Sequence, residues 1–583
     1  MCETLGKIAK LLELNGENPF KIRAYTNAAH ALEIAPLSQE ELLSSEKLEQ
    51  ILGIGKAIAQ KIVQLASTGN LPLLNDLQAK FPESLMRLFE VPGLGSKKIK
   101  VLFEQLGIAD LPALEAACKD GRVAALPGFG EKTAQNILKG LASLAAANTS
   151  FLLSSALNTV LPLLDALRES GTVTFAEPAG SLRRRKETVR DIDIICSTKK
   201  PADAIAAFLS LAPKRETLAH GSTKASVILD TGIQCDLRVV APNEFPFAIA
   251  YFTGSKEHNV AIRSLCLERG WSLNEYRLST LENTNHHPLP EVNEEADLHR
   301  ALGLDYIPPE LRENTGEIEA AREKRLPKLL ELQHLRGVLH NHTNWSDGKN
   351  SLEEMATAAA ELGLDYLGIA DHSKSSVQAR GLSEARLREQ VARIREFNAN
   401  PNRPITLLAG IECDILKDGS LDFPDDLLAD LDYVVASIHS AFQMTESEMT
   451  QRIIRAICHP LVTILAHPTG RLLLKRDPYP VNLSAVIEAA AETGTLIELN
   501  ANPRRLDLDW RWWPLAKSKG VLCSINPDAH STDGFNDLYF GVAIARKGWL
   551  EKHNVLNTLP LDKLFKFLSL PKSHRRSTPL QTL

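Results

Sequence analysis

The spacing of apolar and polar positions divides the chain into three stretches that predict different structures. Residues 1 to about 145 follow a helical period almost throughout. From there to about 315, strand-like apolar runs with single acidic residues set into them alternate with helical runs. A charged, helix-capable stretch that contains Pro327 follows. Beyond it, seven short apolar runs recur between helical segments, and this alternation favours a parallel (β/α)7 barrel.

Two glycines separated by one apolar residue occur three times in the helical region, each time between two helix-like segments. Glycine lets the backbone turn sharply and approach a phosphate, and the next helix aims its free N–H groups at that phosphate. One such pair is weak support, because helices often end in glycine. Three in register look like helix-hairpin-helix motifs, which bind the DNA backbone without reading its sequence; plain helical connectors are the alternative. The predicted DNA contacts are Gly53, Gly55, Gly93, Gly95, Gly128 and Gly130.

A Gly-Ser turn and a basic cluster at 180–186 lead into a strand-like run that carries two carboxylates. Side chains at i and i+2 of a strand point to one face, so Asp191 and Asp193 are expected side by side. Asp236 lies in another apolar run and is expected to pair in from a neighbouring strand. Three hard oxygen ligands suit Mg²⁺ or Mn²⁺ better than Zn²⁺. The alternative is that these acids belong to strand-end turns and that the basic cluster is a solvated charge run.

This stretch resembles the palm of the family X DNA polymerases, the nucleotidyltransferase superfamily of DNA polymerase beta. The resemblance implies that Ser181 and Arg184 contact the triphosphate of an incoming nucleotide. It also implies that Asp191, Asp193 and Asp236 hold two metal ions and catalyse the attack of a primer 3′ hydroxyl on the α-phosphate.

The turn Tyr251-Phe-Thr-Gly254 resembles the nucleotide pocket of the same family. The resemblance places the aromatic pair near the sugar and places two residues of the next helix, four apart on one face, beside the nascent base pair. The implied nucleotide-binding residues are therefore Tyr251, Phe252, Gly254, Asn259 and Arg263. Two positions depart from the family pattern. Lys256 is often acidic in eukaryotic members, and Gln234 replaces an arginine.

The segment Asn18-Pro-Phe-Lys-Ile-Arg-Ala-Tyr25 resembles the opening of the small lyase domain of these polymerases. The match places Lys61 at the catalytic lyase position, with Lys21 and Tyr25 at flanking phosphate-contact positions. A lysine with a lowered pKa forms a Schiff base with the aldehyde of an abasic sugar. Ala57 stands where the family usually has a second lysine. The alternative is an ordinary solvated lysine on an amphipathic helix.

Most apolar runs of the third stretch end in residues that bind metals, where a (β/α) barrel collects its functional groups. These histidines and carboxylates exceed the needs of one tetrahedral ion, which predicts two or three ions. The region resembles the PHP phosphoesterase family, which implies Mn²⁺ or Zn²⁺ and hydrolysis of phosphate esters. Asp347 stands where many members have histidine, and the arginines of 502–505 offer a phosphate contact. The implied metal ligands are His340, His342, Asp347, His372, Glu412, His439, His467, Asp528 and His530.

Composition adds limits to this interpretation. The chain has 583 residues, 44% of them hydrophobic and 24% charged, and a formal net charge of −6. Phosphate binding must therefore come from local geometry rather than from bulk charge. The eight cysteines form no CxxC pair, which favours buried thiols in a reducing compartment. The start lacks a signal peptide and no run is long enough to span a membrane, so we expect no membrane partner and a cytoplasmic location. The resemblance to a bacterial family X polymerase implies the bacterial nucleoid as the place within it.

The order of these parts resembles a bacterial family X DNA polymerase with a C-terminal PHP domain. The fold class expected is multidomain, with an α-helical helix-hairpin-helix domain, an α+β nucleotidyltransferase palm and thumb, and a (β/α)7 PHP barrel. The expected boundaries are 1–145 for the DNA-binding and lyase-like domain, 146–240 for the palm, 241–315 for the thumb, 316–335 for a linker, 336–570 for the PHP domain and 571–583 for a loose tail.

The resemblance implies a monomeric repair polymerase that fills short gaps in gapped or nicked DNA with dNTPs. Its PHP domain would act as a Mn²⁺-dependent 3′-5′ exonuclease, with 3′-phosphatase or abasic-site endonuclease activity as further options. One alternative is a PHP nuclease or phosphatase whose polymerase half only holds DNA. Others are a scaffold that binds DNA ends, or a barrel that hydrolyses a small phosphorylated metabolite.

Overall fold

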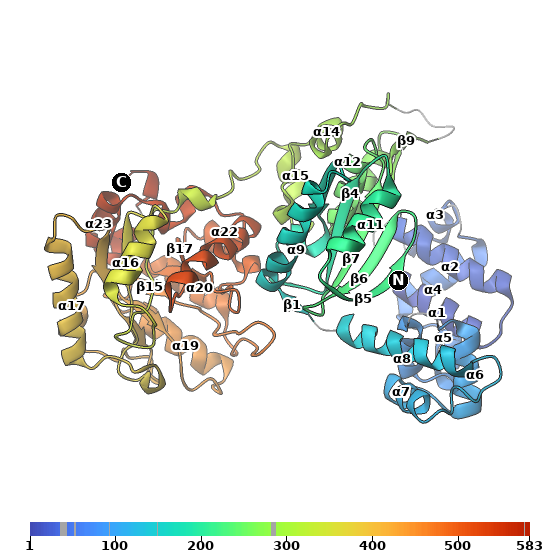
Figure 1. Cartoon of the computed structure of the whole chain (residues 1–583), viewed down its shortest axis with the longest axis horizontal. Coiled ribbons are helices and arrows are strands. Elements are labelled where there is room, and N and C mark those ends of the chain that lie inside the picture. Colours follow the sequence, from blue (N-terminus) through green and yellow to red (C-terminus); the bar gives the residue numbers. More distant parts are fainter. Residues whose placement is uncertain are drawn as a thin grey trace. The chain divides into compact units, whose positions relative to one another are not determined.

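The computed structural model describes residues 1–34, 43–51, 54–91, 94–147, 150–281, 287–576 and 578–582 (Figure 1). The chain forms two compact units. The first contains residues 1–149, 228–234 and 256–289, and the second contains 150–227, 235–255 and 290–583. The stretch 241–315, expected as one domain, thus contributes to both units. None of the helices in the described ranges is long and apolar enough to cross a membrane.

The first unit is mainly helical, as its apolar period predicts. Leu5, Ile8 and Leu12 of the first helix repeat every three or four residues and are fully buried, so this face forms part of the core. The helices are α1 (Cys2–Leu14), α2 (Pro19–Ile34), α3 (Ser45–Glu49), α4 (Lys56–Thr68), α5 (Pro72–Lys80), the 3-10 helix η2 (Glu83–Glu90), α6 (Ser96–Leu106), α7 (Leu111–Lys119), α8 (Gly130–Ala147) and α13 (Lys256–Leu267). The antiparallel strands β8 (Trp271–Leu273) and β9 (Leu278–Thr280) complete it.

The second unit begins with a five-stranded sheet whose strands β4 and β7 carry the predicted aspartates. The alternation holds, because Ile192 and Ile194 are fully buried on one face of β4, while Asp191 and Asp193 occupy the alternate positions on the other face. The strand order is β2 (Phe175–Pro178), β4 (Asp191–Ser197), β7 (Gln234–Val240), β6 (Lys224–Leu229) and β5 (Lys214–His220). Helices α9 (Leu153–Glu169), α11 (Pro201–Leu211) and α12 (Phe245–Thr253) accompany this sheet, which we call the palm (Figure 1).

The segment between the palm and the C-terminal domain is partly helical. It contains α14 (Glu295–Ala301), the 3-10 helix η3 (Pro309–Leu311) and α15 (Glu317–Arg322). Glu317 is fully buried and accepts hydrogen bonds from the backbone N–H groups of Asn314 and Thr315 at 2.9 and 2.7 Å. The expected linker 316–335 therefore begins as a packed helix.

The C-terminal domain is built on parallel strands, as the seven apolar runs predict. Two bridges join its two sheets, one between His372 and Glu412 and one between Asn341 and Ala529, so the strands surround a common centre. The first sheet has β10 (Gly337–Val338), β11 (Tyr366–Ile369) and β12 (Thr406–Ala409). The second has β13 (Glu412–Asp414), β14 (Val435–Ser437), β15 (Ile464–Leu465), β16 (Leu496–Asn500) and β17 (Cys523–Asn526). Strands β12 and β13 together form the third predicted strand.

Two glycines allow a buried aromatic ring to fill the centre of the barrel. A Cβ atom at Gly368 would lie 2.4 Å from the hydroxyl oxygen of Tyr433, and one at Gly410 would lie 2.4 Å from its Cζ atom. The Tyr433 hydroxyl donates a hydrogen bond to the Ile369 carbonyl at 3.1 Å. Gly410 separates β12 from β13, so this close packing sets where Glu412 begins the next strand segment.

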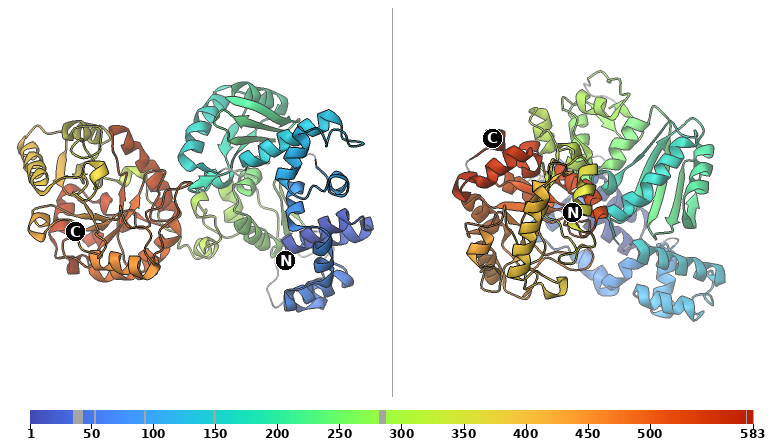
Figure 2. Two further views of the ribbon diagram at one scale, coloured as in Figure 1. Left: turned by 90° about the horizontal axis from the view of Figure 1, so that it is seen from below. Right: turned by 60° about the vertical axis from the view of Figure 1, so that its left-hand side comes forward.

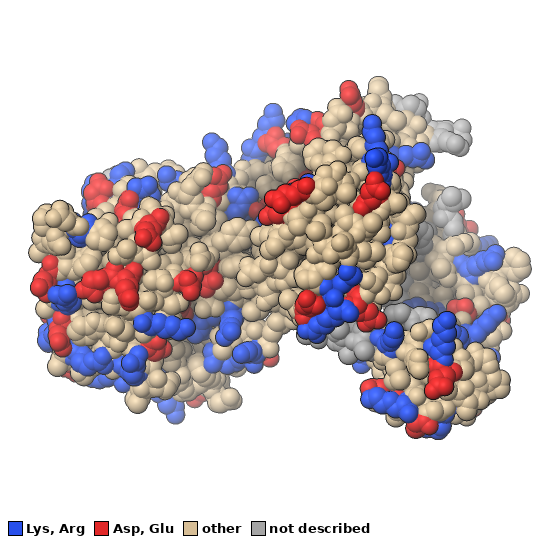
Figure 3. Space-filling view, viewed as in Figure 1, with Lys and Arg blue, Asp and Glu red and all other residues tan. Residues whose placement is uncertain are grey.

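Helices surround these strands in Figures 1 and 2. They are α16 (Leu352–Glu361), α17 (Glu384–Ala399), α18 (Asp425–Leu428), α19 (Glu446–Ile457), α20 (Leu483–Thr493), α21 (Trp513–Ser518), α22 (Leu538–Lys547), α23 (Leu561–Ser569) and α24 (Lys572–Arg575). Charged side chains of both signs are intermixed on the face in Figure 3, in line with the small net charge.

The expectation of a loose tail after residue 570 differs from the structure. Lys572 is largely buried, and its ammonium group donates a hydrogen bond to the His459 carbonyl at 2.8 Å. Leu580 is 4% exposed and packs against the core that contains Leu564 and Phe567. These two contacts could not be predicted from the polar composition of the tail, because only Leu580 is apolar.

We expect Gly410→Ala to destabilise the C-terminal domain, because the added methyl group would overlap the Tyr433 ring. Overpacking of this kind costs about 1–3 kcal/mol. The measurement is the melting temperature of this domain by calorimetry. Gly55→Ala is the control, since a Cβ atom there meets nothing within 4 Å. Equal melting temperatures for Gly410→Ala and wild type would contradict the expectation.

Candidate active sites

The palm brings the three predicted aspartates to one edge of its sheet. Asp191 and Asp193 lie on β4, and Asp236 lies on the adjacent strand β7. The Lys224 ammonium group pairs with Asp236 at 2.9 Å. A Cβ atom at Gly180 would lie 2.7 Å from Asp193 Oδ2, and Gly180 has a φ of +59°. Glycine is therefore needed at this turn both for its backbone conformation and for the close approach of the carboxylate.

The electrostatics of the aspartates indicate a site for positive charge. Burial, together with the Asp191 and Asp236 carboxylates, raises the pKa of Asp193 to about 7. Desolvation and the Asp236 carboxylate also raise the pKa of Asp191. Like charges this near to one another disfavour ionisation unless a cation offsets them. In the described part of the chain, the carboxylate oxygens of these three aspartates do not all lie within 4.8 Å of one another.

The predicted triphosphate contacts lie at the turn that begins with Gly180. Ser181 and Arg184 belong to or directly follow the short helix α10 (Gly180–Arg183). The Arg184 guanidinium group donates to Glu313 Oε1 at 3.1 Å and to the Thr253 carbonyl at 2.5 Å. Within the described residues its Nη2 atom has no hydrogen-bond partner, so the N–H groups of this nitrogen remain for a ligand.

The predicted aromatic pair belongs to the same unit. The rings of Tyr251 and Phe252 meet edge to face with centroids 5.1 Å apart, and the Arg238 guanidinium carbon lies 4.5 Å from the Phe252 ring centroid. Gly254, with a φ of +68°, ends helix α12. Asn259 and Arg263 lie one turn apart on α13, which belongs to the other compact unit. The structure thus leaves their predicted position at the nascent base pair untested.

Two of the three predicted lyase residues come together in the first unit. The Lys61 ammonium group donates a hydrogen bond to the Tyr25 hydroxyl at 2.8 Å and lies 5.2 Å from its ring centroid. The Tyr25 side chain is otherwise fully buried in the core. Lys21 pairs with Glu17 one turn earlier at 2.8 Å.

The glycine pairs do not all have the same backbone. Gly55 and Gly95 are the N-cap residues of α4 and α6, with φ of −84° and −95°. Other residues adopt these angles, and a Cβ atom at either glycine would meet nothing within 4 Å. Neither the backbone angle nor contacts with the described residues therefore require glycine at these two positions. Gly128 and Gly130 instead have φ of +83° and +64°. Gly53 and Gly93 lie outside the described residues.

The nine predicted ligands of the C-terminal domain gather around the carboxyl ends of its strands. Their ligand atoms form four overlapping groups, in each of which all atoms lie within 4.8 Å of one another. Because several residues belong to two groups, the cluster fits more than one metal ion. The groups are His342, Asp347, His372 and His530; His340, His342 and Glu412; His340, His467 and Asp528; and His372, Glu412 and His439.

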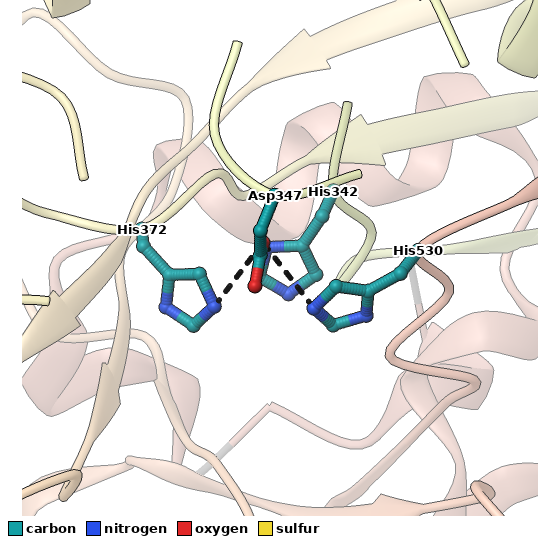
Figure 4. A group of neighbouring side chains, drawn as sticks. All are labelled: His342, Asp347, His372 and His530. Atoms are coloured by element: carbon teal, nitrogen blue, oxygen red, sulfur yellow. Dashed lines mark ion pairs between the residues drawn. The ribbon is translucent and has the colours of Figure 1, made fainter. Parts of the chain in front are cut away.

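Glu412 lies at the centre of this cluster and is 1% exposed. Its carboxylate oxygens lie 2.8 Å from His372 Nδ1, 2.9 Å from His467 Nε2 and 3.2 Å from His439 Nε2. At the rim, Asp347 Oδ1 lies 3.4 Å from His530 Nε2 and 3.6 Å from His372 Nε2 (Figure 4). Figure 4 shows the His342, His372 and His530 rings arranged around this carboxylate.

Unsatisfied polar atoms show that the cluster fits cations. Among the described residues, several buried ligand atoms have no hydrogen-bond partner, although such atoms are nearly always paired in folded proteins. His372 Nδ1 and Glu412 Oε2, for example, are 2.8 Å apart without hydrogen-bonding geometry. Two ligand atoms that are close together but not hydrogen-bonded suit a single ion that both of them bind. The unpaired atoms are His340 Nε2, His342 Nδ1, His372 Nδ1, Glu412 Oε2 and His467 Nδ1.

Some ligands of the cluster are neutral and others are ionised. Burial and the neighbouring His530 and His372 lower the pKa of His342 to about 3, so this imidazole is neutral and able to bind a metal. Burial opposes the charge of Asp347, but His530 and His342 hold its pKa down at about 2. Burial likewise opposes the charge of Glu412, yet the surrounding histidines hold its pKa well below the usual range.

Sequence analysis did not assign a second layer of residues that orients these ligands. Glu498 is fully buried, lies 2.7 Å from His340 Nδ1 and accepts a hydrogen bond from the backbone N–H of His467 at 2.8 Å. Asp414 lies 3.0 Å from His439 Nδ1. The available signal was an acidic residue on an otherwise apolar strand, in the run that ends at Asn500. Of the arginines at 502–505, Arg505 lies 3.6 Å from the Asp528 carboxylate, so one of them reaches the site.

Comparison with known protein families matches four parts of the chain. Residues 1–71 match a helix-hairpin-helix domain, 85–143 a SAM-like helix-hairpin-helix tandem, 248–313 the DNA polymerase beta thumb and 339–502 the PHP domain. The DNA polymerase/3′-5′ exonuclease PolX of Bacillus subtilis is 39% identical over 566 residues, which cover 97% of this chain and 98% of that protein.

Other relatives match about a third of the chain or less. A protein of Clostridium novyi, named "Probable phosphatase", is 30% identical over 168 residues, 28% of this chain and 63% of that protein. A protein of Clostridium acetobutylicum with the same description is 28% identical over 204 residues, 33% of this chain and 78% of its own length.

We expect Glu498→Gln to weaken metal binding by the C-terminal domain about 10- to 100-fold, the usual effect of removing a carboxylate behind a ligating histidine. Gln keeps the shape but loses the charge that faces His340. The measurement is Mn²⁺ titration by calorimetry. Glu488→Gln is the matched control, because Glu488 is exposed on α20 and, among the described residues, pairs only with Lys519. Equal affinities for Glu498→Gln and wild type would show that Glu498 does not support the site.

Proposed function

Because the chain belongs to the family X DNA polymerases with helix-hairpin-helix, polymerase beta thumb and C-terminal PHP domains, and is a DNA polymerase and 3′-5′ exonuclease, we propose that it fills short gaps during DNA repair and trims the primer end first. The observation that carries the proposal is the presence of two separate sites in one chain, the palm aspartates and the C-terminal cluster. Damaged or unpaired 3′ ends must be removed before synthesis starts.

In the proposed polymerase reaction, Asp191, Asp193 and Asp236 hold the catalytic metals, and Ser181 and Arg184 bind the triphosphate. Mg²⁺ or Mn²⁺ would stabilise the charge that develops on the transferred phosphate. The free donor of Arg184 and the close contact between Gly180 and Asp193 support this assignment. Tyr251, Phe252 and Gly254 would form the sugar side of the pocket, and Asn259 and Arg263 the side of the base pair. Catalysis is then mostly positioning and charge stabilisation.

In the proposed exonuclease reaction, the nine ligands of the C-terminal domain hold two or three Mn²⁺ or Zn²⁺ ions. The ions would supply a water molecule of lowered pKa and clamp the phosphate. Arg505 would contact that phosphate, which its position 3.6 Å from the Asp528 carboxylate supports. The likeness to proteins named as phosphatases favours removal of a 3′-terminal phosphate as a further activity of this site. We propose Mn²⁺ as the activating ion, because Asp347 adds a carboxylate to the histidines at the rim.

DNA binding is proposed for the helix-hairpin-helix glycines. Gly55 and Gly95 stand before α4 and α6, where nothing of the described chain would meet a side chain. A phosphate could approach the free N–H groups at both helix starts. Because the contacts would be to the backbone alone, we propose gapped or nicked DNA without sequence preference as the substrate.

The two-site assignment is tested with a 5′-labelled primer on a one-nucleotide gap, with Mn²⁺, with and without dNTPs. We expect Asp191→Ala/Asp193→Ala to lose extension by about 100-fold or more, because charge stabilisation at the reacting phosphate is lost, while still shortening the primer. We expect His340→Ala/His342→Ala to do the reverse. Lack of extension by wild type would refute the polymerase assignment, and shortening by the histidine variant would place the exonuclease elsewhere.

We also propose that Lys61 has lyase activity, supported by its contact with the Tyr25 hydroxyl. Borohydride should trap wild-type protein on DNA with an abasic site, because reduction fixes a Schiff base. Lys61→Ala should lose this product, whereas Lys56→Ala should keep it, since Lys56 begins α4 about one turn and a half before Lys61. The readout is the covalent complex on a denaturing gel. Unlabelled wild type would end the proposal.

A further inference from the structure

The loop that carries the predicted triphosphate contacts is held by the C-terminal domain. The Lys547 ammonium group, at the end of α22, donates hydrogen bonds to the Arg184 carbonyl at 3.1 Å and to the Glu310 carbonyl at 3.3 Å. It also pairs with Glu313 Oε1 at 2.6 Å. Three acceptors satisfy the three protons of the ammonium group. Lys547 is 1% exposed, so this contact is a built part of the fold rather than a surface ion pair.

Two further contacts hold the same loop. The Trp510 indole N–H donates to Glu187 Oε2 at 3.2 Å, and Arg511 approaches the same carboxylate at 3.4 Å. The Arg185 guanidinium carbon lies 5.6 Å from the ring centroid of Tyr539 on α22. Residues 184–187 of the palm are therefore anchored on the C-terminal domain at each end.

A single carboxylate oxygen is shared by two cations at this junction. Glu313 Oε1 accepts from both Arg184 Nε and Lys547 Nζ. Burial opposes the charge of Glu313, but Lys547 and Arg184 hold its pKa below the usual range. One negative charge thus faces two positive charges. If Lys547 were absent, the whole Glu313 charge would act on Arg184.

We propose that Lys547 is a positioning residue for nucleotide binding: it offsets Glu313 and so leaves the charge of Arg184 available for the triphosphate of a dNTP. This inference rests on the proposed role of Arg184. It assigns to the C-terminal domain, whose own site hydrolyses DNA, a part in nucleotide binding by the palm.

The test is steady-state extension of a primer on gapped DNA by the full chain, with KM for the dNTP and kcat measured separately. We expect Lys547→Met to raise KM about 10-fold, the effect of weakening one charged hydrogen bond to the phosphate. Exonuclease activity on single-stranded DNA should be unchanged. Lys566→Met, at an exposed position of α23, is the matched control and should change neither.

A second substitution separates charge from packing. Lys547→Met/Glu313→Gln removes both buried charges, so Arg184 is free again and KM should return to within about 2-fold of wild type. A raised KM in both the single and the double variant would overturn the proposal, as would an unchanged KM in Lys547→Met. If Lys547→Met also loses exonuclease activity, the KM of Lys547→Met/Glu313→Gln decides. A KM within about 2-fold of wild type supports the proposal, and a raised KM overturns it.

Arg184→Ala distinguishes failure of this inference from failure of the proposed function. A wild-type KM in Arg184→Ala would refute the triphosphate role of Arg184 itself. A raised KM in Arg184→Ala together with a wild-type KM in Lys547→Met would refute the role of Lys547 alone.

Discussion

Burial of many ionisable ligands at the carboxyl ends of parallel strands is the constraint on which the C-terminal domain depends. Carboxylates and imidazoles withdrawn from water are stable only when opposite charges or cations compensate them. Glu412 therefore has histidines on several sides, and Glu498 faces His340 from behind. The small residues in the barrel meet a separate need for space. Gly368 and Gly410 make room for Tyr433, which fills the centre with an apolar ring and keeps the strand ends at fixed spacing.

The palm also withdraws carboxylates from water, but less completely than the C-terminal domain. Its aspartates lie at a sheet edge, where burial and mutual repulsion raise the pKa of Asp193 and Lys224 offsets Asp236. These carboxylates form no compact group within the described residues, whereas those of the C-terminal domain already do. The first arrangement suits cations that arrive with a nucleotide, and the second suits resident cations.

Much of this organisation could be predicted from sequence because it is periodic or local. Alternation placed Asp191 and Asp193 on one face, and the recurring apolar runs located the parallel strands of the C-terminal domain. Contacts between distant segments could not be predicted in this way. Glu498 lies on a predicted strand, but its partner His340 is 158 residues away. The tail was expected to be loose because it is polar, yet Lys572 is anchored by backbone carbonyls that no pattern reveals.

Helix α22 shows why the two activities belong to one folded unit. Its ten residues span about 15 Å, from the loop that follows Asp528 to the palm loop at Arg184. At its start, burial and the Asp528 carboxylate raise the pKa of Asp537 to about 7, so this end of the helix lies near a predicted metal ligand. At its other end, Lys547 is buried against palm residues. A palm without the C-terminal domain would leave Glu313 paired with Arg184 alone and would expose Glu187, so the polymerase half depends on the domain beside it for the charge balance of its own loop.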